Sequence, residues 1–132
     1  SGYFTSRPAL KRQVRFATNL LAAARLLEGA TNTTAAEVGH FTRVRSPVVG
    51  DSWTDSLEGT VGVATHHDGM SGTERQDVTD DYEQRIAESS VQVEAGVALA
   101  LSKMLGVDRG AVTHCNCNAA QDCLNMTVGA AR

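Results

Sequence analysis

The stretch that decides the fold is residues 73–106, TERQDVTDDYEQRIAESSVQVEAGVALALSKMLG. Its apolar residues return at steps of three and four, the spacing of one face of an α-helix. Thr73 and Gln76 have the spacing of a capping box, in which each side chain satisfies a backbone N–H of the other at a helix start. Gly106 follows the last apolar position, where glycine commonly ends a helix. The pattern predicts one long helix whose apolar stripe is Val78, Tyr82, Ile86, Val93, Val97, Leu101 and Met104 or Leu105.

A second helix is predicted near the start of the chain, from Ser6 to about Glu28. Thr5 or Ser6 is expected to cap it, and Pro8 falls in its first turn, where a missing N–H costs nothing. Its apolar stripe is Leu10, Val14, Ala17, Leu21 and Ala24. The basic cluster opposite that stripe consists of Arg7, Lys11, Arg12 and Arg15. We expect this cluster to be solvated or paired within the chain, and the alternative is that it binds phosphate or acidic lipid.

A third helix is predicted from Asp51 to about His66, with capping oxygens supplied by Asp51 and Ser52. Gly59 and Gly62 each weaken a helix by about 1 kcal/mol relative to alanine, so we expect a neighbouring backbone to approach closely there. Residues 30–50 are expected to form an irregular connection with a short helical piece around 34–42.

Three helices with one apolar stripe each are most simply buried against one another. The sequence therefore predicts an all-α fold, an antiparallel three-helix bundle over residues 1–106. The remaining residues, 107–132, show no sustained period and are expected to be an irregular tail that holds all three cysteines. A hydrophobic content of 42% in 132 residues is enough for one core of this kind.

The net charge and the hydropathy of the chain limit the kinds of partner that it is expected to bind. The formal net charge of −3 argues against nucleic acid, since domains that bind phosphate backbones usually carry a basic surplus. No apolar stretch approaches the roughly 20 residues that a membrane span needs. The chain begins with Ser1 rather than methionine, and we expect it to be a segment of a longer protein.

The most unusual local cluster is His66-His67-Asp68, followed by a glycine-rich turn. Consecutive helical residues point about 100° apart, so at most one of the two imidazoles is expected to bind a given metal ion directly. The alternative is that the histidines interact with the partial negative charge of a helix C-terminus. A zinc site needs three or four ligands, and no HExxH or CxxC motif supplies them.

The cysteines and two sequons point to the secretory route. Cys115, Cys117 and Cys123 lack the spacing of a zinc knuckle, so they are candidates for disulfides. Their odd number leaves one whose partner is expected outside the chain. Asn32 and Asn125 each begin an Asn-x-Thr sequon and are candidate glycosylation sites.

Two segments resemble the middle, three-helix domain of glycoside hydrolase family 38 alpha-mannosidases, closest to the lysosomal class II type. Residues 2–8, GYFTSRP, resemble the opening of that domain. Residues 66–73, HHDGMSGT, with the pair Asp81-Tyr82 on the next helix, resemble the family's His-His-Asp signature and the helix after it. The matches occur in the right order over most of the chain.

The resemblance implies a function and a role for each residue of the signature. It implies that His67 binds zinc, together with ligands of a preceding catalytic α/β domain, and that Asp68 hydrogen-bonds the hydroxyls of a bound mannose. His66 would then support the site or be structural. The nucleophile and the general acid would lie upstream, so this chain would hold no catalytic residue and would be inactive alone. One departure is Thr65, which stands where the family has glutamine.

The parent enzyme implied by the resemblance is a retaining, zinc-dependent alpha-mannosidase that hydrolyses terminal alpha-mannosyl residues of N-glycan oligosaccharides. It would work in the lysosome or an equivalent acidic compartment, and a β-rich region would follow the tail. The first alternative is a stand-alone helical protein-interaction module without catalytic activity. The second is a small metal-binding protein that uses His66, His67, His114 and the cysteines.

Overall fold

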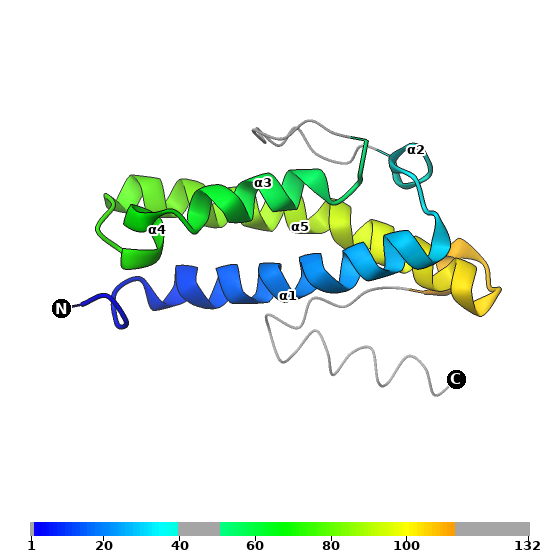
Figure 1. The fold of residues 1–132 in the computed structure, drawn as a ribbon, viewed down its shortest axis with the longest axis horizontal. Helices are drawn as coiled ribbons and strands as arrows, with labels where there is room; N and C mark the ends of the chain where they lie inside the picture. Colours follow the sequence, from blue (N-terminus) through cyan, green and yellow to red (C-terminus); the bar gives the residue numbers. More distant parts are fainter. Residues whose placement is uncertain (1, 40–50, 113–132) are drawn as a thin grey trace.

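The computed structural model of the chain describes residues 2–39 and 51–112. Within these ranges every regular element is helical, so the predicted all-α class is confirmed (Figure 1). The elements are α1 (Pro8–Thr31), α2 (Ala35–Val38), α3 (Asp55–Ala64), α4 (His67–Ser71), α5 (Gln76–Leu105) and the short 3-10 helix η1 (Arg109–Ala111). None of the helices in the described ranges has the length and apolarity needed to cross a membrane.

The long helices α1, α3 and α5 pack side by side (Figure 1). Helices α1 and α5 run in the same direction and α3 runs against both, so each long helix is antiparallel to the next along the chain. The predicted stripe of α1 is buried throughout, as are Ile86, Val93 and Val97 of α5. The prediction was wrong for Met104 and Leu105, which are 59% and 67% exposed because the last turn of α5 extends beyond α3.

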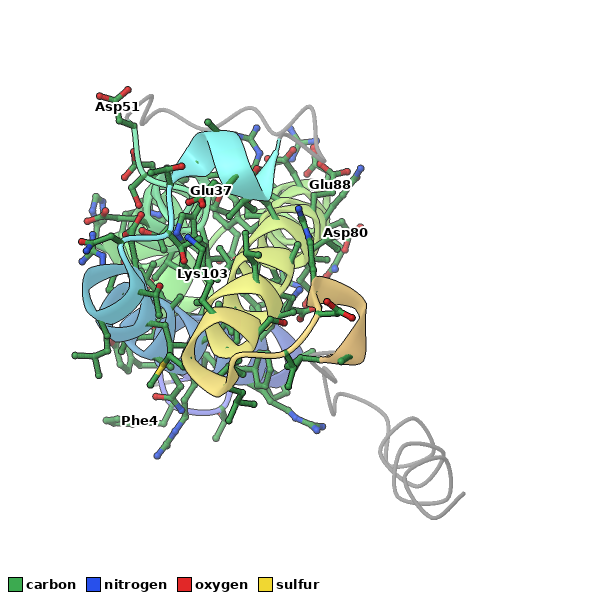
Figure 2. All side chains as sticks on the ribbon, turned by 90° about the vertical axis from the view of Figure 1, so that its right-hand side faces the viewer. Phe4, Glu37, Asp51, Asp80, Glu88 and Lys103 are labelled. Carbon is green, nitrogen blue, oxygen red and sulfur yellow. The ribbon has the colours of Figure 1, made fainter. Side chains whose placement is uncertain are left out.

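Helix α2 and η1 close the end of the bundle where α5 terminates. The hydroxyl of Thr34 and the carboxylate of Glu37 form a capping box that begins α2, which was not predicted from the sequence. The Lys103 ammonium of α5 lies 2.8 Å from the Glu37 carboxylate (Figure 2). Arg109 donates to the backbone carbonyls of Glu37 and Val38. This short helix is therefore attached to the end of α5 by side chains.

Three predicted helix starts were wrong, because the expected capping groups bind elsewhere. Helix α1 begins after Arg7 with no side-chain cap, since the Ser6 hydroxyl donates to a distant carbonyl. Helix α3 begins at Asp55, since Trp53 turns into the core and Ser52 bonds within that turn. Helix α5 begins after Arg75, and the predicted capping box does not form.

The predicted close approach of a neighbour was wrong for Gly62, stays a prediction for Gly59, and was missed at Gly96. A Cβ on Gly62 would meet nothing within 4 Å, whereas one on Gly96 of α5 would collide with the Trp53 ring. Between α3 and α5 the small side chains Ser56, Thr60 and Ser89 hydrogen-bond one another at 3.0–3.2 Å. The hydroxyl groups of small side chains therefore form hydrogen bonds with one another at the contact between these two helices.

Candidate functional site

The His66-His67-Asp68 cluster lies at the turn between α3 and α4, at the end of the bundle where α5 begins (Figure 1). The helix predicted to run to about His66 ends two residues earlier, at Ala64, and His66 has an extended backbone with ψ of 167°. His67 starts α4, so the two imidazoles belong to different elements. The 100° separation expected of neighbours in one helix therefore does not apply to them.

Two glycines allow this turn to be so tight. A Cβ on Gly69 would lie 2.5 Å from the carbonyl oxygen of Ala64, so only glycine lets α4 fold back onto the end of α3. Gly72 has a φ of 73°, in the left-handed region that favours glycine, and it ends α4. The fold of this turn therefore requires glycine at both positions for steric reasons.

The Asp68 carboxylate lies close to both imidazole rings. Its Oδ1 is 3.5 Å from Nε2 of His67, and its Oδ2 is 3.9 Å from Nε2 of His66. The ring centroids are 5.6 Å apart with planes at 71°. Nδ1 of His66 lies 2.7 Å from the Val63 carbonyl oxygen, which can only accept, so Nδ1 is the donor of that bond. His66 is thereby fixed to the end of α3.

Exposure separates the roles that the three side chains can take. The side chain of His67 is 88% exposed and that of Asp68 is 54% exposed, whereas His66 is 36% exposed. His66 also packs edge-on against Tyr82 of α5, with ring centroids 5.9 Å apart. Burial, and then the nearby carboxylates of Glu74 and Asp81, raise the pKa of the Tyr82 phenol. The outward-facing groups of the turn are therefore His67 and Asp68.

The described residues offer no complete metal site. No group of three or more His, Cys, Asp or Glu side chains within residues 2–39 and 51–112 is arranged to hold an ion. The donor set of the turn nevertheless fits one part of a zinc site, because imidazole nitrogen and carboxylate oxygen are ordinary zinc ligands. An open imidazole such as that of His67 can join ligands that another domain supplies.

A shallow hollow of about 350 Å³ opens beside the turn, lined by Gly2, Tyr3, Ser6, Ser71, Gly72 and Thr73. Thr73 links this hollow to the cluster, because its Oγ1 donates to Oδ1 of Asp68 at 3.3 Å. Hydroxyls and an aromatic ring beside a carboxylate are groups that can contact a sugar.

The basic cluster divides into two halves. Lys11 donates to the backbone carbonyls of Tyr3 and Ser6, and Arg7 contacts Glu74 and Gln76. Arg12 and Arg15 are exposed on α1. Arg7 and Lys11 are thus bound within the chain, as the sequence analysis expected, and their contacts with residues 2–6 and 74–76 could not be foreseen from helix spacing.

Of the other candidate site residues, the structure describes only Asn32. Asn32 is exposed and ends α1 with a φ of 48°, and its glycosylation stays a prediction. The remaining candidates lie outside the described residues, namely His114, Cys115, Cys117, Cys123 and Asn125.

Comparison with known proteins shows the family to which this helical domain belongs. Residues 1–104 match the family described as alpha mannosidase middle domain, and the chain belongs to that family. It is 42% identical over 108 residues, 82% of its length, to a probable alpha-mannosidase of Arabidopsis thaliana. It is 36% identical over 106 residues, 80% of its length, to the lysosomal alpha-mannosidase of Homo sapiens. The chain spans 9% and 10% of those two relatives, and no solved structure matches it.

Proposed function

We propose that this chain is the middle domain of a zinc-dependent, retaining alpha-mannosidase that hydrolyses terminal alpha-mannosyl residues of N-glycan oligosaccharides. Membership of the alpha mannosidase middle domain family supports the class of the parent enzyme. The observation that carries the site is the outward-facing pair His67 and Asp68 on a tight turn at one end of the bundle.

In this proposal His67 is the one direct zinc ligand that the chain contributes. Its exposed ring can approach a neighbouring domain, whereas the ring of His66 is held by Val63 and Tyr82. When bound, zinc supplies a Lewis acid that stabilises charge on sugar oxygens. The Asp68 carboxylate accepts hydrogen bonds from mannose hydroxyls, and Thr73 orients it.

The preceding catalytic domain and a following β-rich region of the same polypeptide are the partners of the bundle in this proposal. They hold the remaining zinc ligands, the nucleophile and the general acid, so the chain alone is inactive. The lysosome, or an equivalent acidic compartment, is the proposed location. The lysosomal relative of Homo sapiens supports it.

The test uses the full-length protein, with zinc content measured after dialysis and hydrolysis measured on a p-nitrophenyl alpha-mannoside. Loss of a residue that hydrogen-bonds a metal ligand typically weakens metal binding about 10- to 100-fold. Because His67 is proposed as a direct ligand, His67→Ala is expected to weaken zinc binding by more than this. Asp68→Asn is expected to keep zinc and to lower kcat/KM about 10- to 100-fold, since hydrogen bonds to charged groups contribute about 1.5–3 kcal/mol. Asp77→Asn, at an exposed position on α5, is the matched control.

Two results would contradict the proposal. Wild-type zinc content and turnover in His67→Ala would remove His67 from the site. High-affinity, stoichiometric zinc binding by the isolated 132-residue chain would mean that the metal site does not need another domain.

A further inference from the structure

Arg7, the residue before α1, has an unusual backbone conformation. Its φ of 49° and ψ of 52° lie in the left-handed region, which is unfavourable for a residue with a side chain. Such a conformation persists where surrounding contacts determine it. It directs the guanidinium to residues 74–76, at the start of α5, instead of along α1.

The Arg7 guanidinium contacts residues 74–76 at several points. Nη2 donates to the carbonyl oxygen of Glu74 at 2.9 Å, and Nη1 donates to Oε1 of Gln76. Nε lies 3.9 Å from Oε1 of Glu74, whose side chain is only 4% exposed. Within the described residues, Oε2 of Glu74 is buried without a hydrogen-bond partner. A buried carboxylate is expensive without a nearby cation, so the charge of Arg7 also stabilises this corner.

Ser6 fixes the other side of the same segment. Its Oγ donates to the carbonyl oxygen of Ser71 at 2.7 Å. A Cβ on Gly72 would lie 2.4 Å from Oγ of Ser6 and 3.0 Å from Cγ of Arg7. The Ser6-Arg7 corner therefore rests directly on the backbone at Gly72.

The segment held in this way is the one that orients Asp68. The backbone N–H groups of Gly72 and Thr73 donate to the Asp68 carbonyl oxygen at 3.0 and 3.1 Å, as the Ser71 hydroxyl also does at 3.1 Å. The Thr73 hydroxyl donates to the Asp68 carboxylate. Ser6 and Arg7 thus hold the backbone segment 71–76, and Thr73 of that segment donates to the carboxylate beside His67.

We propose that Arg7, assisted by Ser6, is a positioning residue that fixes the Asp68 carboxylate for mannose binding through residues 71–76. This inference rests on the proposed function, because it assigns Arg7 to the same mannoside site. Arg7 touches neither sugar nor metal in this proposal and acts only through Asp68.

The experiment measures the full-length protein and uses Arg7→Lys, which keeps a positive charge near Glu74. The lysine ammonium is a point charge and cannot replace the planar fork that reaches Glu74 and Gln76 together. Arg12→Lys, at an exposed position of α1 five residues further along the chain, is the matched control. The readouts are the unfolding temperature, kcat and KM on the p-nitrophenyl alpha-mannoside, and calorimetric affinity for methyl alpha-mannoside. We expect Arg7→Lys to weaken mannoside affinity and to lower kcat/KM about tenfold, with Arg12→Lys unchanged.

A double-mutant cycle with Asp68→Asn separates positioning from general destabilisation. If Arg7 acts through Asp68, Arg7→Lys has less than about a twofold further effect on affinity in the Asp68→Asn background. An equal loss in both backgrounds would overturn the proposal. So would a normal affinity in Arg7→Lys when Asp68→Asn is impaired, and that result would leave the proposed function standing.

Two further results complete the test. If Arg7→Lys does not fold, Ser6→Ala enters the same cycle, with an expected loss of about threefold in affinity and the same lack of further effect with Asp68→Asn. If neither His67→Ala nor Asp68→Asn changes zinc content or affinity, the proposed function itself fails and this inference fails with it.

Discussion

The indole of Trp53 lies so close to the backbone of Gly96 that no side chain fits between them. A Cβ on Gly96 would be 2.2 Å from Cε3 and 2.5 Å from Cζ3 of the ring. Trp53 is fully buried, and its Nε1 donates to the Thr33 carbonyl oxygen at 3.1 Å. This contact fixes the turn before α3 onto α5.

Gly96→Ala is therefore expected to destabilise the bundle. Alanine favours an isolated helix by about 1 kcal/mol over glycine, but overpacking a filled core commonly costs about 1–3 kcal/mol or more. Steric overlap with a rigid ring places this position at the high end of that range. Urea unfolding of the chain, followed by circular dichroism, measures the change.

Gly62→Ala is the matched control for that prediction. It lies in α3 with open space around its Cα, so alanine is expected to stabilise the chain by about 0.5–1 kcal/mol. Equal effects of the two substitutions would contradict the close contact between Gly96 and Trp53.

The Glu37 carboxylate gives a prediction for acidic pH. The hydrogen bond from Lys103, followed by that from the Thr34 backbone, lowers the pKa of Glu37 from 4.5 to about 2. A carboxyl group with a depressed pKa in the folded state stabilises it fully above the unfolded pKa. Its contribution is therefore complete above pH 4.5 and is lost as the pH falls from 4.5 towards 2.

Lys103→Met tests this assignment. It removes the ammonium group and is expected to raise the pKa of Glu37 towards 4.5, as measured by titration of its carboxyl carbon by NMR. Arg75→Met, at an exposed position near the other end of α5, serves as the control. The assignment would be wrong if Glu37 titrated alike in Lys103→Met and in the unmodified chain.

Tyr82 gives the opposite prediction at alkaline pH. Burial raises its pKa first, and the nearby Glu74 carboxylate raises it further. Because the folded chain keeps this proton to a higher pH than the unfolded chain, the contribution to stability is present below pH 10 and is lost as the pH rises through the folded pKa. In Tyr3→Phe, Tyr82 is the one remaining tyrosine, so its ionisation can be followed by ultraviolet absorbance. We expect a higher midpoint in the folded chain than in urea, and coincident midpoints would refute the burial of the phenol.

The fold was largely predictable from local pattern. The spacing of Leu10, Val14, Ala17, Leu21 and Ala24 located the buried face of α1, and the stripe around Ile86 and Val93 located that of α5. Such stripes report burial directly, because a helix returns to the same face every three or four residues.

The helix starts were not predictable, because contacts between distant residues decide them. Ser6 would be a good cap by residue type, but Ser71, 65 positions away, accepts its hydrogen bond. Thr73 likewise donates to Asp68 instead of capping α5. Residue type alone cannot rank these competing partners.

The candidate site was predictable as a motif and not as a geometry. The unusual run His66-His67-Asp68 was visible in the sequence, and its identification depended on a family resemblance. Helix α4 was missed, because the residues after Asp68 were expected to form a glycine-rich turn, whereas Gly69 lies inside a short helix. Arg7 and Glu74 could not be connected without the fold, since 67 positions separate them.

Helix α5 joins the two ends of the molecule in one piece. Its 30 residues make it about 45 Å long, with the histidine-bearing turn packed near its beginning and Lys103 near its end. A continuous, packed α-helix behaves as a stiff rod. The turn that packs His66 against Tyr82 and the short helix whose Glu37 pairs with Lys103 are therefore held at a fixed separation along one helix.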